Sequence, residues 1–579
     1  MKHSVKYAIL LLAALSLASC SKFLNRPAED TYNSDNFYQD DAQCEMGVNY
    51  LYNSPWFDVI RGFINVGEIF SGNYYTGGGG YKNFSVNGTD SDLVKMSASL
   101  WSVNAHCSTV YNRLATAGCS EETRNRLQGE VLTMKALAYF YLVRSFGDVP
   151  IVHDVQAEIS AGQYNTVRRV RKADVYEYII LTLEKAMSLL PKKVGNKDGR
   201  IDYYSAEGLL AKVYLTKAGV TGTLLQEDLD KAAAYAKDVI EHSGRYLMSE
   251  YSDVFRMKNN KNIEALISWH WYGDWQPYTV QNEFQCNLAM KGFEEYGTCW
   301  GQWNGPSVDL QEAFGVTAVM DPAMRQDPDT RRKATMMLAG DVYEYFWRDR
   351  EYAPGKKGFD YVKFLYDPVY GAGSEGSLCC NTGAACVKFL WGDIADHQDE
   401  LGYTPHSQAS GLSTHILRLS DVYLVYCEAM TGASRGSTSD KTALDAFYAV
   451  RHRARSNYNY PASISWEDVW KERRLELAME GDRWYDFVRL AYHHPAEAIA
   501  EIKNQKRNYY DNLGKVYENY YNSGYTVWDA SGVTYNTTDP APNVTEASFT
   551  LPLPTEDVVF NPYLLEDPIH VDVRNTYAY

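Results

Sequence analysis

Amphipathic helices recur along this chain, and they constrain its fold more than any other feature of the sequence. Over residues 203–219 the apolar side chains follow the spacing i, i+3, i+4, i+7 and i+8, which places them on one face of an α-helix: Ala206, Leu209, Leu210, Val213 and Tyr214. Residues 228–244 repeat this spacing and end at Gly244, a residue type that often follows a helix. Small residues on both segments allow the two helices to pack closely.

These two segments resemble a tetratricopeptide helix pair in their order of small and large apolar residues. Similar spacing predicts further helices near residues 93–117, 127–146, 172–190, 418–431, 440–455 and 466–490. Together the predicted helices make four pairs. The third pair is split, because its second helix, at 418–431, follows a long insertion.

The insertion, residues 245–417, has a different character from the helices. It is rich in Trp, Tyr, Gly and Pro, and short apolar runs such as residues 264–271 predict strands. A second irregular stretch, residues 71–90, precedes the first pair and contains a run of glycines. Long irregular excursions from a rigid scaffold usually form binding surfaces. We therefore expect a mainly α fold in which four tetratricopeptide-like helix pairs form a scaffold and a large, irregular, loop-rich half carries the ligand site.

The N-terminal apolar run predicts export. Residues 8–18 are too few to span a bilayer, which needs roughly 20 apolar residues, and Lys2 and Lys6 precede them, as in a signal peptide. The run ends in the lipobox order, Leu17-Ala18-Ser19-Cys20. We predict that residues 1–19 are removed and that acyl chains on Cys20 tether the protein outside the cytoplasm. An ordinary secretory signal is the alternative.

The charge of the chain argues against nucleic acid and membrane surfaces as partners, and the cysteine spacing argues against a zinc site. The chain has 56 basic and 73 acidic residues, and loss of residues 1–19 removes two lysines and no acid, leaving a net charge of −19. This balance argues against binding to nucleic acid and against electrostatic docking on a membrane. Nine cysteines remain besides Cys20, and Cys379, Cys380 and Cys386 lack the paired spacing of a zinc site. No metal or cofactor is assigned, and disulfide pairing and calcium binding are left open.

Two motifs resemble parts of catalytic or nucleotide-binding sites. Five acidic residues near the C-terminal helices suggest a glycosidase, which needs two carboxylates: Glu472, Glu476, Glu480, Asp482 and Asp486. They alternate with arginines at helical spacing, which favours ion pairs within or between helices. The glycine-rich residues 76–83 lack the G-K-[ST] of a phosphate-binding loop. No catalytic residue is assigned.

Aromatic residues in the irregular regions are the candidates for ligand contact. The chain has 47 Tyr and 13 Trp, whose flat apolar faces and polar edges suit the faces of sugars. Trp101 and Asn104 lie one helical turn apart and form an indole-plus-amide recognition unit. The full set of candidate ligand-binding residues is Tyr74, Tyr75, Trp101, Asn104, Trp275, Tyr278, Trp300 and Trp303.

Six segments in order resemble the SusD/RagB family, the surface lipoproteins of Bacteroidetes nutrient-uptake systems. They are residues 20–44, 129–152 (GEVLTMKALAYFYLVRSFGDVPIV), 417–430 (LRLSDVYLVYCEAM), 443–455 (ALDAFYAVRHRAR), 472–490 (ERRLELAMEGDRWYDFVRL) and 551–564 (LPLPTEDVVFNPYL). The resemblance implies one SusD-like domain over residues 20–579. Its parts are an N-terminal half at 20–244, the insertion at 245–417, repeat helices at 418–492 and an irregular C-terminal region at 493–579.

The resemblance also implies a function and a partner. It implies a non-catalytic lipoprotein of the outer membrane, facing the cell exterior, that captures an oligosaccharide or polysaccharide. It further implies a SusC-like, TonB-dependent β-barrel transporter over which the lipoprotein acts as a lid. Alternatives are a peptide cargo, a surface glycoside hydrolase, and a repeat scaffold that binds only protein.

Overall fold

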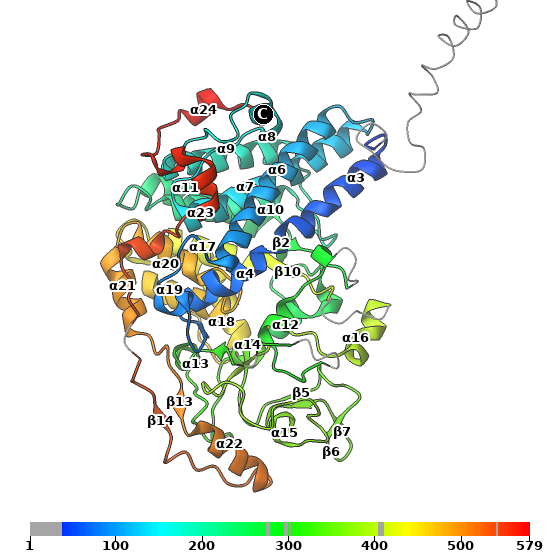
Figure 1. Ribbon diagram of the computed structural model, residues 1–579, viewed down its shortest axis with the longest axis vertical. Helices are drawn as coiled ribbons and strands as arrows, with labels where there is room; N and C mark the ends of the chain where they lie inside the picture. The colour runs from blue at the N-terminus through cyan, green and yellow to red at the C-terminus, as the bar shows by residue number, and fades with distance from the viewer. Residues whose placement is uncertain (1–36, 274–277, 295–298, 302, 403–409, 540–541) are drawn as a thin grey trace, which may run out of the picture.

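The chain folds into a helical body joined to an irregular, loop-rich part, drawn above and below one another in Figure 1. The computed structural model describes residues 37–273, 278–294, 299–301, 303–402, 410–539 and 542–579. Cys20 and the predicted signal peptide lie outside these residues. Within the described ranges, no helix is both long enough and apolar enough to cross a membrane.

The helical body is mainly α, as predicted from the periodicity. Its helices are α6 (Ser91–Ala115), α7 (Glu121–Phe146), α9 (Lys172–Leu189), α10 (Tyr203–Lys217), α11 (Gln226–His242), α17 (Leu419–Ala429), α18 (Lys441–Ala454), α19 (Trp466–Glu476) and α20 (Arg483–Ala491). Helix α7 packs on α6 and α9, α10 packs on α9 and α11, and α17 packs on α18. Across the insertion, α11 packs against α17. The split third pair is therefore confirmed, because the apolar faces of α11 and α17 cover each other although a long insertion separates them.

The predicted helix at 466–490 is wrong in one respect, because the structure divides it into α19 and α20. The chain turns between them, and Met479 and Gly481 adopt positive φ angles of 64° and 77°. The backbone N–H of Gly481 donates to the buried Glu68 carboxylate at 2.6 Å. A Cβ on Gly481 would lie 2.5 Å from the Phe63 ring, so the turn requires glycine.

Shorter helices surround this body. They are α3 (Asp41–Asn49), α4 (Val59–Ile64), α5 (Gly80–Asn83), α8 (Val155–Ser160), α12 (Phe284–Leu288), α13 (Val308–Ala313), α14 (Thr330–Thr335), α15 (Tyr361–Tyr366), α16 (Ile394–Leu401), α21 (Pro495–Asn504), α22 (Leu513–Asn522), α23 (Thr555–Phe560) and α24 (Val573–Thr576). Figure 1 shows α12 to α16 in the irregular part and α24 beside the helical body.

The strands form two-stranded antiparallel ladders. The longest pairs β2 (Ala265–Trp269) with β10 (Thr414–Arg418), which confirms the strand predicted at 264–271. The others are β1 (Tyr74–Tyr75) with β3 (Gly305–Pro306), β4 (Met336–Met337) with β9 (Ala385–Cys386), β5 (Val342–Tyr343) with β8 (Phe359–Asp360), β6 (Glu351–Ala353) with β7 (Lys356–Lys357), β11 (Ser437–Thr438) with β12 (Ile464–Ser465), and β13 (Tyr510–Asp511) with β14 (Thr534–Tyr535). The β2–β10 ladder closes the insertion at its base, because it joins the insertion's first and last segments.

The acidic residues that suggested a glycosidase are held in buried ion pairs. Glu476 is fully buried and lies 3.1 Å from Arg418 and 3.0 Å from Arg331. The other four acids contact arginines as well: Glu472 with Arg331, Glu480 with Arg418, Asp482 with Arg144, and Asp486 with Arg473. The ion-pair interpretation is therefore confirmed, and the pairs join different elements of the fold.

His415, in β10, is buried next to this network and is expected to make the protein sensitive to acid. Its Nε2 donates to the Val254 carbonyl at 3.0 Å, and its Nδ1 lies 2.8 Å from the Ser268 hydroxyl. Burial, together with the positive charge of Arg418, lowers the pKa of His415 to about 4. The folded protein therefore holds a neutral imidazole at pH values where the unfolded chain binds a proton.

Lowering the pH from 7 to 5 should therefore reduce the free energy of unfolding. In the unfolded chain the histidine titrates near pH 6.5, so the loss from His415 begins there and reaches about 2 kcal/mol at pH 5. The measurement is urea denaturation at both pH values for the wild type and His415→Gln, which should lose less stability. His242→Gln, at an exposed histidine in the last turn of α11, is the control. An unchanged pH dependence in His415→Gln would contradict the prediction.

Candidate ligand-binding site

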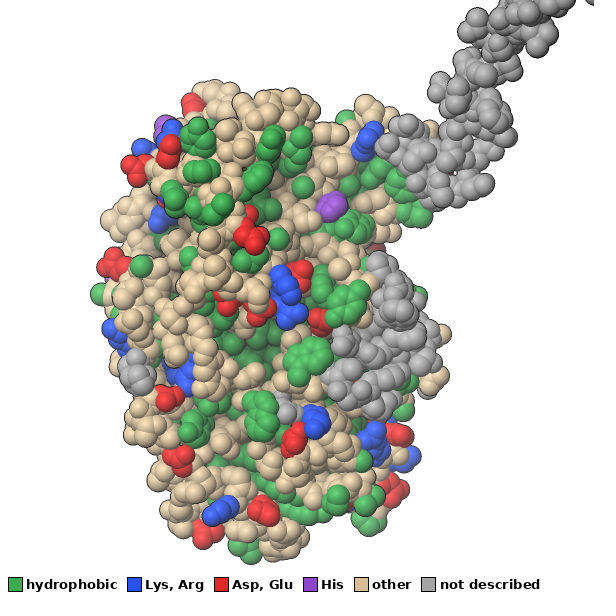
Figure 2. All heavy atoms as spheres, in the orientation of Figure 1, with side chains coloured by type: hydrophobic (Ala, Val, Ile, Leu, Met, Phe, Trp, Pro, Cys, Tyr) green, Lys and Arg blue, Asp and Glu red, His purple; other side chains and the backbone are tan. Residues whose placement is uncertain are grey.

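A polar cavity of about 160 Å³ lies where the first irregular stretch meets the insertion. The pairing of β1 with β3, in which Tyr74 lies opposite Pro306, holds residues 74–76 beside residues 303–306. The walls come from α4, the π-helical segment Asn65–Phe70, the start of α6 and the start of α12. Figure 2 shows hydrophobic and charged side chains side by side in the middle of this face, between the helical body and the irregular part.

The indole of Trp300 forms one wall of the cavity, and hydrogen bonds hold it in position. Trp300 is 46% exposed, and its Nε1 donates to Asn287 Oδ1 at 3.1 Å. Its backbone N–H donates to the Cys286 carbonyl at 2.9 Å. Two hydrogen bonds therefore fix a tryptophan that still presents nearly half of its surface, which is the condition for a stacking platform.

The rest of the cavity lining carries charged and amide groups. Asn65 Nδ2 donates to Asp92 Oδ2 at 2.9 Å, and Arg61 Nε lies 3.6 Å from Asp92 Oδ1. Glu283 accepts a hydrogen bond from the Tyr278 hydroxyl. Burial raises the pKa of Glu283, although that hydrogen bond acts in the opposite direction. Donors and acceptors thus face one small space beside an indole, an arrangement that matches the many hydroxyls and the apolar faces of a polyol.

Three of the predicted residues meet at this cavity. Tyr74 and Trp300 line it, and they come from the two separate irregular stretches. Tyr278 lies next to it, half exposed, with its ring 5.3 Å from Phe57 in an edge-to-face contact. Tyr74 is almost fully buried, so it forms part of the cavity's inner wall.

The other predicted residues lie elsewhere. Trp101 packs edge-to-face on Tyr139 at 6.1 Å, and the buried Asn104 donates to the Val152 carbonyl at 3.2 Å. Trp101 and Asn104 therefore do not line this cavity, and their role as a recognition unit stays a prediction. Tyr75 is buried beside Tyr509, and Trp303 is 60% exposed but does not line the cavity. Trp275 lies outside the described residues.

Sequence reasoning missed the polar half of the site. Arg61, Asn65 and Asp92 line the cavity, yet each sits in or beside a helix where a charged or amide residue normally faces solvent. Glu283 and Asn287 were also missed, although they flank the predicted Tyr278. No spacing in the sequence distinguishes these residues, because they converge only after α4, α6 and α12 come together.

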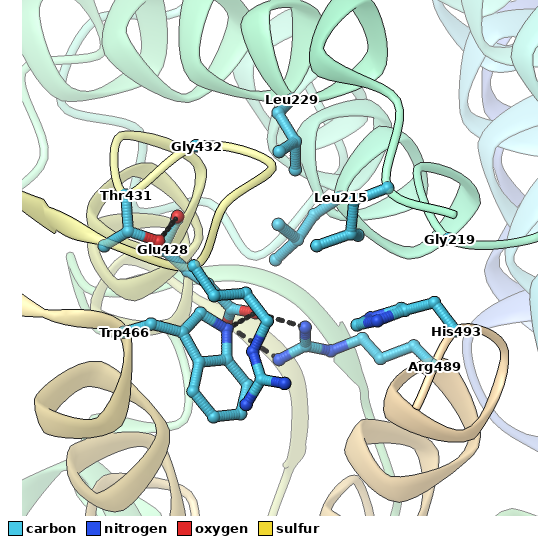
Figure 3. A pocket seen from close by; sticks show the side chains of 11 residues that line it. Leu215, Gly219, Leu229, Glu428, Thr431, Gly432, Trp466, Arg489 and His493 are labelled. Carbon is cyan, nitrogen blue, oxygen red and sulfur yellow. Dashed lines mark hydrogen bonds and ion pairs between the residues drawn. The ribbon is translucent and has the colours of Figure 1, made fainter. Parts of the chain in front are cut away.

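Other hollows lack the features of this cavity. The one in Figure 3 holds only about 10 Å³ and is closed by Glu428, which accepts from Trp466 Nε1 at 3.2 Å and Arg489 Nη2 at 2.8 Å. That volume suits a single water molecule. Three wider hollows of about 690, 480 and 440 Å³ are lined without any tryptophan.

Comparisons with known proteins identify relatives that cover between 65% and 97% of this chain. A family model described as "SusD family" matches residues 242–570, and one described as "Starch-binding associating with outer membrane" matches residues 101–215. A SusD-like protein of Bacteroides ovatus is 31% identical over 588 residues, covering 97% of this chain and 98% of its own. The starch-binding protein SusD of Bacteroides thetaiotaomicron is 25% identical over 401 residues, covering 65% and 66%.

Solved structures agree with the observed fold. A crystal structure described as containing xylogluco-oligosaccharide is 28% identical, with a TM-score of 0.74, and covers 91% of this chain and 99% of its own. A laminarin-binding SusD-like protein has a TM-score of 0.59 and 21% identity, covering 92% and 100%. The second likeness shows a shared fold.

Proposed function

Because the chain belongs to the SusD family, we propose that it is a non-catalytic glycan-binding protein that captures oligosaccharide at the cell surface for import. The observation that carries this proposal is the cavity between the two irregular stretches. There Trp300, half exposed and hydrogen-bonded to Asn287, lines the same space as Arg61, Asn65 and Asp92. The structure with xylogluco-oligosaccharide supports a sugar as the ligand.

The arrangement of carboxylates supports binding over hydrolysis. Asp92 is engaged by Asn65 and lies near Arg61, and Glu283 accepts from Tyr278. A glycosidase needs one carboxyl group free to donate a proton and a second free to act as nucleophile or base across the scissile bond. Three carboxylates line the cavity, and hydrogen bonds hold two of them, Asp92 and Glu283, to other side chains, as expected for groups that orient sugar hydroxyls; Asp58 is the third.

Isothermal titration with a panel of glycans, followed by a reducing-end assay, tests the proposal. The panel includes xylogluco-oligosaccharide and laminarin, because the descriptions of two similar structures mention these glycans. Saturable binding without new reducing ends supports a receptor, whereas turnover establishes a hydrolase. Binding of peptides alone would assign a peptide cargo. If the protein binds a transporter but neither glycans nor peptides, it is a scaffold that binds only protein.

We further propose that the protein is a lipoprotein anchored through Cys20 to the outer membrane, facing the exterior, as the lid of a SusC-like, TonB-dependent transporter. The lipobox supports the anchor, and the family description "associating with outer membrane" supports the location. Membership of the SusD family supports the transporter as partner.

Cys20→Ala is expected to release the protein from membranes or to leave an uncleaved precursor, because no acyl chain can then be attached. Membrane fractionation and labelling with a fatty acid analogue measure this effect. Lys22→Ala, two residues away, should leave both readouts unchanged. Normal labelling of the Cys20→Ala variant in the outer-membrane fraction would refute the anchor.

A further inference from the structure

Two buried cysteines lie together beside the ligand cavity. Cys286, in α12, and Cys299 are 2% and 4% exposed, and their thiols are hydrogen-bonded to each other. The backbone holds them in this position, because Trp300 N–H donates to the Cys286 carbonyl at 2.9 Å and Gly301 N–H donates to the Ala289 carbonyl at 3.0 Å. Residues 299–301 therefore run directly alongside residues 286–289.

Each of these cysteines is next in the chain to one partner of the hydrogen bond between Trp300 and Asn287. Trp300 follows Cys299 in the chain, and Asn287, which accepts from the Trp300 indole, follows Cys286. A bond between the two sulfurs would therefore hold the platform and its hydrogen-bond acceptor at a fixed separation. Such constraint increases affinity by reducing the entropy that is lost when a ligand orders its site.

We propose that Cys286 and Cys299 form a disulfide that fixes Trp300 in position for ligand binding. The proposal rests on the proposed function, since an exported chain meets an oxidising compartment in which disulfides persist. The two thiols are oxidised, losing two protons and two electrons, and a dithiol–disulfide oxidant of that compartment is reduced. One thiolate attacks the oxidant's disulfide, and the second thiolate then displaces the oxidant's thiol from the mixed disulfide.

The disulfide forms while the chain folds. In the folded protein the hydrogen bond to Cys286 and burial both raise the pKa of the Cys299 thiol, and Glu294 adds to the effect. The reactive species in exchange is the thiolate, so the reduced, folded protein reacts slowly. Oxidant present during refolding should therefore introduce the disulfide much faster than the same oxidant added afterwards.

Peptide mapping under non-reducing conditions tests the bond directly. Trypsin cuts after Lys261, Lys291 and Arg325, so residues 262–291 and 292–325 separate, each with a single cysteine. In full-length protein purified from an oxidising periplasm, or refolded with oxidised glutathione, we expect one linked species that lacks two hydrogens and separates on reduction. Recovery of both peptides unlinked, with Cys286 and Cys299 alkylated, from folded protein of both preparations would overturn the proposal.

Matched variants identify the bond without relying on activity. Cys286→Ser and Cys299→Ser should each abolish the linked species. Cys427→Ser is the control, because the buried Cys427 thiol in α17 donates to the Ala443 carbonyl at 3.2 Å, and it should leave the species intact. If a serine variant fails to fold, the map of the wild-type protein still decides the question.

Titration with the best glycan then tests the positioning role. The oxidised wild type should bind roughly 2- to 10-fold more tightly than the same protein after reduction, since one side chain is held in place beforehand. Equal affinities would overturn the positioning role. A linked peptide with no glycan bound by either form would contradict the proposed function and leave the disulfide established.

Discussion

Replacing Trp300 by alanine is expected to weaken glycan binding by about 1–3 kcal/mol, or roughly 5- to 150-fold, because it removes the only tryptophan among the described residues that line the cavity. The side chain is 46% exposed, so its loss should have little effect on folding. Isothermal titration measures the affinity, and thermal denaturation of the same preparation measures the stability.

Tyr460→Ala is the matched control for this substitution. Tyr460 is 49% exposed and donates to Asp445 of α18 at 2.7 Å, far from the cavity in the chain and on a different element. It should bind glycan like the wild type. Wild-type affinity in a stably folded Trp300→Ala protein would exclude this cavity as the binding site, whereas a lower melting temperature without a change in affinity would assign Trp300 to packing.

Replacing Arg418 by methionine is expected to lower the free energy of unfolding by about 3–5 kcal/mol. Arg418 is 1% exposed, and its guanidinium contacts the buried carboxylates of Glu264, Glu476 and Glu480. Although burial raises the pKa of Glu476, Arg453, Arg418 and Arg331 together lower it to about 2. Without Arg418 each of the three carboxylates loses one of its cationic partners, and breaking a buried ion pair by removing one partner is costly.

Urea denaturation followed by tryptophan fluorescence measures this loss. The double variant Arg418→Met, Glu480→Gln should recover part of it, because it also removes the charge of one carboxylate that Arg418 contacts. Lys441→Met is the control, since Lys441 pairs with Asp445 on the surface of α18 with its side chain 83% exposed; it should unfold at the wild-type urea concentration. A loss no larger than that of the control would show that the network adds nothing to stability.

The helical body could be predicted closely because its information is local. The predicted segments 203–219 and 172–190 correspond to α10 (Tyr203–Lys217) and α9 (Lys172–Leu189), since a face of apolar residues repeating every 3.6 positions is visible within one segment. The break between α19 and α20 was missed for the opposite reason. It depends on Glu68, which accepts from the backbone of Gly481 and lies far away in the chain.

The candidate site was predicted only in part. Its aromatic residues were predicted, and its charged residues were not. Tyr74, Tyr278 and Trp300 could be predicted because they are aromatic residues in irregular stretches. No helical spacing there accounts for them as part of the scaffold's packing. Arg61 and Asp92 resemble any charged residues on a helix. They become part of a site only because α4 and α6 pack together and leave these side chains facing the same space.

By itself, therefore, the sequence determined the helix pairs, the insertion between α11 and α17, and the regions in which ligand contacts were to be sought. Periodicity and composition encode these features within short stretches. Only the tertiary structure decided that β1 meets β3, that Trp300 and Arg61 line one cavity, and that Asn104 donates to the Val152 carbonyl. The physical reason is that a cavity and its hydrogen bonds depend on distances between segments hundreds of residues apart, which are set by how the apolar faces of the scaffold cover one another.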